Sequence, residues 1–183
     1  MCSGNGTNFE NIVRTCKGDE VVIMIHNKEK CGAAKRADKL GIPHTYIDNK
    51  NEELIIDVMR AWKVDLIVLA GWMRIVTSKF IDSFPDRIIN IHPSLLPKYK
   101  GLNVVQRALD AGDEQTGCTV HYVTEELDSG AIIHQAIVPI LPADTVKSLT
   151  RAIQRKEHEI LPLAIEYVKQ RQQTTVDRNV LSS

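Results

Sequence analysis

The segment Asn90-Ile91-His92 places an amide and an imidazole two residues apart. Residues 88–91 form an apolar run that predicts a buried strand, and side chains two apart on a strand project on the same face. An amide can stabilise a developing negative charge, and an imidazole can move a proton near neutral pH. The pair therefore suits acyl transfer, and the alternative is a buried Asn and His satisfied by nearby backbone groups.

A carboxylate that could serve this pair lies in the polar turn at residues 125–130. Asp128 near His92 would stabilise the imidazolium form of the ring. Asp is also common in turns for its backbone geometry, and the spacing alone does not bring Asp128 to His92. Of the other histidines, His121 is the one expected nearest the pocket, because its predicted strand runs toward Asp128.

Residues 3–9, Ser-Gly-Asn-Gly-Thr-Asn-Phe, open a predicted helix. Glycines let the backbone approach an anion closely, and free N–H groups at a helix start favour negative charge. We predict a phosphate site made by the amides of Gly6, Thr7 and Asn8. A tight turn with a Thr or Asn cap is the alternative.

A long C-terminal helix carries an inward carboxylate. Its apolar stripe includes Ile153 and Ile160, and the helical spacing puts Glu157 on the same face. A buried carboxylate needs a partner or a ligand. A ribose hydroxyl, an amine, or an internal Arg or Lys would each serve.

The elements that must position these groups alternate along the chain. Apolar runs predict buried strands, and apolar residues three or four apart predict helices. This order indicates an α/β fold with an open, mostly parallel, Rossmann-like sheet and helices on both faces. Strands are predicted at residues 21–25, 66–70, 88–91, 119–123 and 132–140, and helices at 7–17, 32–40, 51–62, 77–84 and 145–170.

Four further expectations concern the first strand, the last helix and the tail. In a doubly wound fold the glycine-rich loop follows a central first strand, so we expect that strand to be missing from the chain as given. Asp144 is expected to cap the last helix, and Pro162 to kink or break it. Residues 172–183 are expected to form a polar, frayed tail.

Composition narrows the function classes. Lys plus Arg and Asp plus Glu both number 23, a balance that argues against a general nucleic-acid binder. Four scattered cysteines suggest neither a metal site nor a disulfide framework, which fits a reduced, cytoplasmic setting. There is no signal-peptide pattern, and no apolar run approaches the roughly 20 residues that span a bilayer.

Four blocks together resemble the folate-dependent formyltransferase superfamily, and the likeness runs to about Tyr167. The Asn-x-His block and the distant Asp are typical of the whole superfamily. The glycine-rich opening and the Lys-Tyr-Lys-Gly ending point to the branch that acts on phosphoribosylglycinamide. The blocks are residues 2–8, 69–75, 89–101 and 121–130.

The resemblance implies direct transfer of a formyl group from the co-substrate 10-formyltetrahydrofolate to the amine of phosphoribosylglycinamide, in purine (IMP) biosynthesis and without a metal. His92 would be the general acid/base, Asn90 would hold the oxyanion, and Asp128 would support the charged form of His92. The chain would be one domain over residues 1–171, with a phosphate-binding half at 1–94 and a folate and catalytic-turn half at 95–171.

The same resemblance implies the binding residues. The acceptor's phosphate would lie on Gly6, Thr7 and Asn8, and its ribose on Glu157. The expected partners are small molecules, without nucleic acid or membrane, for a monomer or homodimer. The folate would contact Met73, Arg74, Ile75, Val76, Asn90, Thr124, Glu125, Glu126, Leu127 and Asp128.

The chain departs from the superfamily pattern in one contact besides the first strand. An Arg often touches the folate shortly after the third strand, and here Lys50 stands nearby. Lys is not a bidentate donor, so the folate tail could be held more loosely.

Three other functions compete. A 10-formyltetrahydrofolate hydrolase commonly has a second His in place of Pro93 and an N-terminal regulatory domain. A methionyl-tRNA formyltransferase normally adds a C-terminal domain and a basic surface. A non-catalytic remnant that binds folate or a phosphorylated ligand is the third alternative, kept open by the missing strand.

Overall fold

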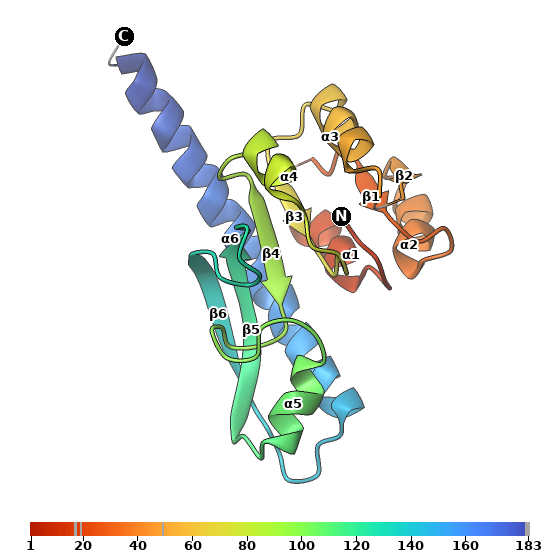
Figure 1. Cartoon of the computed structure of the whole chain (residues 1–183), viewed down its shortest axis with the longest axis vertical. Coiled ribbons are helices and arrows are strands. Elements are labelled where there is room, and N and C mark those ends of the chain that lie inside the picture. Colours follow the sequence, from red (N-terminus) through yellow and green to blue (C-terminus); the bar gives the residue numbers. More distant parts are fainter. Residues whose placement is uncertain (17, 19, 49, 182–183) are drawn as a thin grey trace.

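The computed structural model describes residues 1–16, 18, 20–48 and 50–181, and Figure 1 shows their arrangement. Strands and helices alternate up to β4, and α5, a long antiparallel hairpin and a long helix follow. The helices are α1 (Thr7–Thr15), α2 (Gly32–Leu40), α3 (Glu52–Ala61), α4 (Ser78–Ser83), α5 (Val104–Asp110) and α6 (Val146–Leu181). The strands are β1 (Met24–His26), β2 (His44–Tyr46), β3 (Ile67–Leu69), β4 (Ile88–His92), β5 (Gln115–Tyr122) and β6 (Ile132–Pro139).

The sheet has two parts joined by the first residues of the chain. β1 pairs parallel with β2; β3 pairs parallel with β4, which continues antiparallel to β5 and then β6. Between β1 and β3, the Cys2 amide donates to Ile25 O (2.9 Å) and Met1 O accepts from the Ala70 amide (3.0 Å). Among the described residues, only 1–3 occupy this position, which a doubly wound fold gives to a central strand before the glycine-rich loop. The predicted fold class, a mostly parallel α/β sheet, is confirmed.

Alternation along the strands sorts the core onto the two faces of the sheet. Ile88 packs with α3 and α4 in a cluster that includes Ile55 and Phe80. Ile89 and Ile91 point the other way, into the cluster covered by α6. Asn90 and His92 therefore share the face of Ile88, opposite α6.

Pro162 lies inside α6 without ending it, so the predicted break is wrong. A proline has no N–H, which leaves the carbonyl four residues earlier, on His158, without its helical donor. The Asn11 side chain of α1 supplies that donor: its Nδ2 donates to His158 O at 2.8 Å. The helix thus continues through the proline and is fastened to α1 at this point.

Both ends of α6 differ from the sequence expectation. The Ser148 amide donates to Thr145 Oγ1 (3.2 Å), so Thr145 caps the helix, whereas Asp144 binds the Ser148 hydroxyl and the Leu141 amide. The helix continues to Leu181, so the predicted frayed tail is helical over residues 172–181. Figure 1 shows this end of α6 running past the sheet. A helix that is already formed along its packed turns can propagate further at little cost per residue.

Two short elements were not predicted from the sequence. β2 has only three residues, none in an apolar run, and α5 follows a loop in which Asn103 has a left-handed φ of 56°. β1 begins at Met24 rather than at residue 21, and the predicted end of the first helix at Lys17 lies outside the described residues. Within the described ranges, no helix combines the length and apolar character that crossing a bilayer requires.

Asn11→Ala should lower the free energy of unfolding by about 1 kcal/mol, because the His158 carbonyl loses its donor. Combining it with Pro162→Ala should recover most of that loss, since an alanine at this position brings the helical N–H back. Urea denaturation of the two single variants and the double variant gives the coupling energy. If the losses of unfolding free energy in the two single variants simply add in the double variant, the proposed role of Asn11 is contradicted.

Candidate active site

The pairing of β4 with β5 assembles the polar centre of the molecule. Asn90 lies opposite His121, and His92 lies opposite Thr119. The Asn90 Nδ2 atom is 3.2 Å from His121 Nε2, and His121 Nδ1 is 2.8 Å from Tyr122 O. A carbonyl only accepts, so His121 Nδ1 carries the proton and Nε2 accepts from Asn90. His121 therefore fixes which way the Asn90 amide points.

Asp128 lies between the two imidazoles, as the contact predicted with His92 requires. Its Oδ2 is 3.5 Å from His92 Nδ1, and its Oδ1 is 3.6 Å from His121 Nε2. The other nitrogen of His92, Nε2, is 2.9 Å from Tyr99 O. Both nitrogens of His92 thus face acceptors, and an imidazolium could donate to both. The structure brings together Asn90, His92 and Asp128, with His121 as the link.

Asp128 is held by backbone as well as by charge. It adopts a left-handed φ of 49°, which Asp tolerates better than most residues, and its Oδ2 accepts from the Gly101 amide at 2.9 Å. Burial opposes its ionisation, but the hydrogen bond from the Gly101 amide and the positive charges that His92 and His121 carry when protonated outweigh burial. The pKa of Asp128 therefore lies below its usual value, and the carboxylate stays charged at neutral pH.

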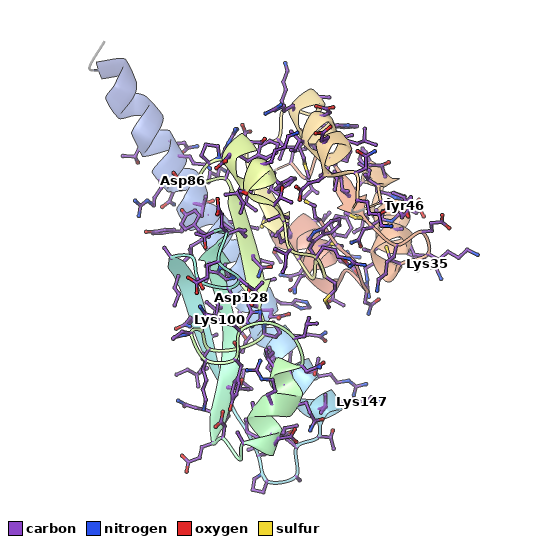
Figure 2. The ribbon with its side chains drawn as sticks, viewed as in Figure 1. Lys35, Tyr46, Asp86, Lys100, Asp128 and Lys147 are labelled. Atoms are coloured by element: carbon purple, nitrogen blue, oxygen red, sulfur yellow. The ribbon has the colours of Figure 1, made fainter. Side chains whose placement is uncertain are left out.

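A lysine fastens the loop over the site to the turn that carries Asp128. Lys100 Nζ lies 3.0 Å from Glu126 Oε1 and also bonds the Ser129 hydroxyl. Figure 2 shows Lys100 and Asp128 close together where this loop meets the turn before β6. The exposed Glu126 contact is weak by itself, so the bond from the Gly101 amide to Asp128 carries more of this connection.

The glycine-rich loop leads into α1 with its amides available. Gly6 has a left-handed φ of 76°, and a Cβ there would lie 2.7 Å from Ala33, so glycine is required. The first N–H groups of a helix have no helical acceptor, and in the part of the chain described here no other acceptor faces those of Gly6, Thr7 and Asn8. This is the geometry expected of an anion site.

Glu157 is inward-facing as predicted, and its partner is an amide rather than an Arg or Lys. Its carboxylate accepts from Asn8 Nδ2 at 2.8 Å, and the two residues are 7% and 9% exposed. Burial raises the pKa of Glu157, and the Asn8 hydrogen bond only partly counters it. The Asn8 Oδ1 atom is buried and lacks a partner among the described residues. An orphaned acceptor beside a carboxylate suits a ligand that donates hydrogen bonds.

The two segments expected around a flat heterocycle present apolar side chains to solvent. Met73 and Ile75 are 61% and 71% exposed, and Leu127 is 44% exposed, whereas Val76 faces the core. The Met73 amide donates to Ser3 Oγ (2.9 Å), which joins this segment to the glycine-rich loop. The other residues predicted here lie on the same exposed segments: Arg74, Thr124, Glu125 and Glu126.

The described residues contain no cluster of metal-ligand side chains, and the Cys118 thiol near Glu157 is unreactive. Over the described ranges, no group of three or more His, Cys, Asp or Glu is placed to hold a metal ion. Burial, with the nearby Glu157 carboxylate, raises the pKa of the Cys118 thiol to about 12. Cys118 therefore stays protonated at neutral pH and is a poor nucleophile.

Three contributors to the site carry no side-chain signal in the sequence. Tyr99 offers its carbonyl and Gly101 its amide, and any residue type has these groups. Arg36 binds the glycine-rich loop from α2 and lies in an ordinary amphipathic pattern. His121 differs from these three, because its place on a predicted strand that runs toward Asp128 could be read from the sequence. Lys50 lies in the exposed turn before α3, and its proposed contact stays a prediction.

Comparisons with known proteins agree on one family. The family model described as "Formyl transferase" matches residues 1–165. A phosphoribosylglycinamide formyltransferase of Haemophilus influenzae is 43% identical over 178 residues, covering 91% of this chain and 84% of the relative. One of Escherichia coli is 40% identical, with the same two shares. The crystal structure of an Anaplasma phagocytophilum phosphoribosylglycinamide formyltransferase has a TM-score of 0.89 at 40% identity, covering 92% of this chain and 84% of that chain.

Glu157→Gln should stabilise the protein at neutral and alkaline pH but not at acid pH. A raised pKa means that the folded protein binds this proton more tightly than the unfolded chain does. Protonated Glu157 therefore stabilises the unaltered protein at low pH, and this contribution is lost as the pH rises through the folded-state pKa. Gln keeps an acceptor for Asn8 without the buried charge. Thermal melts at about pH 4 and about pH 8 test this.

The matched control is Glu159→Gln, a 58% exposed carboxylate on the same helix. This control should show no pH-dependent gain in melting temperature. An equal effect of Glu157→Gln at both pH values would contradict the buried-carboxylate interpretation.

Proposed function

The chain belongs to the formyl transferase family and performs formyl transfer in purine biosynthesis, and we propose that Asn90, His92 and Asp128 carry the reaction. The observation that best supports this proposal lies at the carboxyl end of β4, where His92 and Asp128 are 3.5 Å apart. Asn90 contacts His121, which lies beside the same carboxylate. Ligands of open α/β sheets bind beyond that end.

The relatives' names identify the acceptor we propose, the amine of phosphoribosylglycinamide. The family uses a folate co-substrate, and we propose 10-formyltetrahydrofolate, which would supply the formyl group. The exposed Met73, Ile75 and Leu127 fit it, because side chains of this kind left in solvent suit a flat heterocycle. The backbone amides beside them would fix its polar edge.

His92 would move the proton that the amine loses. In the described state its Nε2 donates to Tyr99 O, so the acceptor must reach His92 by displacing or joining that carbonyl. Asp128 would keep its negative charge throughout, since its pKa is held low, and would stabilise the imidazolium. This arrangement supports His92 as the general acid/base and Asp128 as the residue that supports its charge.

Asn90 would stabilise the oxygen on which negative charge develops. Its Nδ2 carries two hydrogens, and His121 Nε2 takes one of them. The second remains for the oxyanion. Because His121 holds the amide in one orientation, the donor needs no rearrangement when the charge appears, and such preorganisation makes this kind of contact effective.

The acceptor's phosphate would lie on the amides of Gly6, Thr7 and Asn8 at the start of α1. The ribose would lie between Asn8 and Glu157, where the orphaned Asn8 Oδ1 and the carboxylate both accept from hydroxyls. The two contacts are coupled, because Asn8 takes part in both. The other folate contacts, at Arg74, Val76 and residues 124–126, are proposed on the resemblance alone.

The remaining expectations stay predictions. They are a cytoplasmic location, a monomeric or homodimeric state, and the absence of nucleic-acid and membrane partners. The hydrolase alternative is not favoured, because the relatives matched over most of their length are named as transferases.

Purified protein should release tetrahydrofolate only when both phosphoribosylglycinamide and 10-formyltetrahydrofolate are present. The amine is the proposed nucleophile, so the formyl group has no acceptor when the amine is omitted. Absorbance of the folate product, with either substrate omitted as the control, measures this. Release without the amine would favour the hydrolase, and no release at all would favour a binding remnant.

His92→Ala should lower kcat by about 10²- to 10⁴-fold, the usual contribution of a general acid/base. His134→Ala, on β6 and outside the site, is the matched control and should keep a kcat close to that of the unaltered protein. Circular dichroism checks that both variants fold. A near-normal kcat in folded His92→Ala would remove His92 from the mechanism.

A further inference from the structure

Arg36 of α2 binds the glycine-rich loop on the side of its carbonyl oxygens, opposite the amides proposed to bind phosphate. Its Nε donates to Asn5 O at 2.8 Å, and its Nη2 lies 3.5 Å from Asn5 Oδ1. Its Nη1 pairs with Glu10 of α1. The Arg36 side chain is 30% exposed, and its planar guanidinium links α2, the loop and α1.

Arg36 completes a set of donors to three successive loop carbonyls. Gly4 O accepts from the Ala33 amide (3.1 Å), Asn5 O accepts from Arg36, and Gly6 O accepts from the Glu10 amide (3.0 Å). A peptide group points its N–H away from its C=O. Donors on the carbonyl side therefore hold the following amides toward the side where an anion would lie.

The middle carbonyl is the one that no secondary structure secures. The Gly6 bond is the first of α1, and the Gly4 bond comes from the first turn of α2. Within the described ranges, only the Arg36 side chain donates to the Asn5–Gly6 peptide, whose N–H is the first of the three proposed phosphate donors. α2 also lies close under the loop, because a Cβ on Gly32 would be 2.5 Å from Asn5 Oδ1. Arg36 thus acts on a loop that is already confined on one side.

We propose that Arg36 is a positioning residue for phosphate recognition: by holding Asn5 O, it aims the loop amides at the phosphate of the acceptor. This inference rests on the proposed function for the phosphate site and for the identity of the acceptor. Arg36 itself stays behind the loop and touches no substrate atom. A guanidinium suits this place, because its rigid fork can donate to a carbonyl and a carboxylate at once, which an ammonium does less well.

The alternative is that Arg36 only stabilises the fold through Glu10. Arg14 separates the two cases, because its Nη2 also pairs with Glu10, at 2.8 Å, but it does not touch the loop. Lys35 is the second control: it neighbours Arg36 on α2 and points outward into solvent in Figure 2. Neither control should change phosphate affinity by more than about twofold, since exposed charges contribute little.

The binding test uses ribose 5-phosphate, followed through the ¹H–¹⁵N signals of Gly6, Thr7 and Asn8. In the unaltered protein these signals should shift and saturate. Arg36→Ala should raise the Kd by about tenfold, the loss expected for one charge-assisted hydrogen bond. Arg36→Lys keeps the charge and should fall between the two. Arg14→Ala should bind normally.

The kinetic test compares phosphoribosylglycinamide with ribosylglycinamide, which lacks the phosphate. Arg36→Ala should raise KM for the phosphorylated acceptor by about tenfold, with kcat at saturation within about threefold and no change in kcat/KM for ribosylglycinamide. A merely structural role would weaken both acceptors alike. Thermal melts check that each variant folds, and Arg36→Lys serves where Arg36→Ala does not.

Each outcome bears on the inference. Normal ribose 5-phosphate binding by Arg36→Ala or full recovery by Arg36→Lys would overturn it, as would equal losses for both acceptors. Absence of shifts at Gly6, Thr7 and Asn8 in the unaltered protein would overturn it together with the phosphate site. Saturable shifts that Arg36→Ala weakens, in a protein without formyl transfer, would refute the proposed function and leave the role of Arg36 supported.

Discussion

β4 and β5 pair antiparallel with Asn90 opposite His121, and the rest of the site depends on that register. A slip of one residue would turn Asn90 and His92 toward α6 and bring Ile91 to the site. The register is secured by burial, because Ile89, Ile91, Cys118 and Val120 all face the α6 cluster. The apolar face of the hairpin thus sets the position of the polar one.

The same hairpin explains why one carboxylate can serve two imidazoles. β5 carries His121 toward its end, and the following turn brings Asp128 back over the carboxyl end of β4. The left-handed backbone at Asp128 and the Gly101 amide hold the carboxylate there. Because Asp128 is buried with its low pKa maintained by donors, the site keeps a fixed negative charge beside the ring that must gain and lose a proton.

Much of this could be predicted from the chain, and the rest could not for physical reasons. Asn90 and His92 follow from strand alternation, and Glu157 from the helical stripe, since both depend on local periodicity. The contact between Asp128 and His92 needed a structure, because turn geometry decides it. Arg36 and Tyr99 could not be found at all: one acts through a distant backbone carbonyl, and the other contributes only its own. The break expected at Pro162 was wrong because the donor that replaces the proline's missing N–H lies on another helix.

Pro162 has a consequence for the alignment of two helices. The backbone of an uninterrupted helix repeats at each turn, so a backbone contact alone could form one turn, about 5.4 Å, higher or lower. The proline removes that ambiguity, since within α6 up to the last turns only His158 presents a carbonyl that its own helix has left unbonded. Asn11 can dock at that height alone, and three residues earlier on α1, Asn8 then meets Glu157. The proline therefore fixes the height at which α1 packs along α6. That height in turn places Asn8 beside Glu157, where the ribose is proposed to bind.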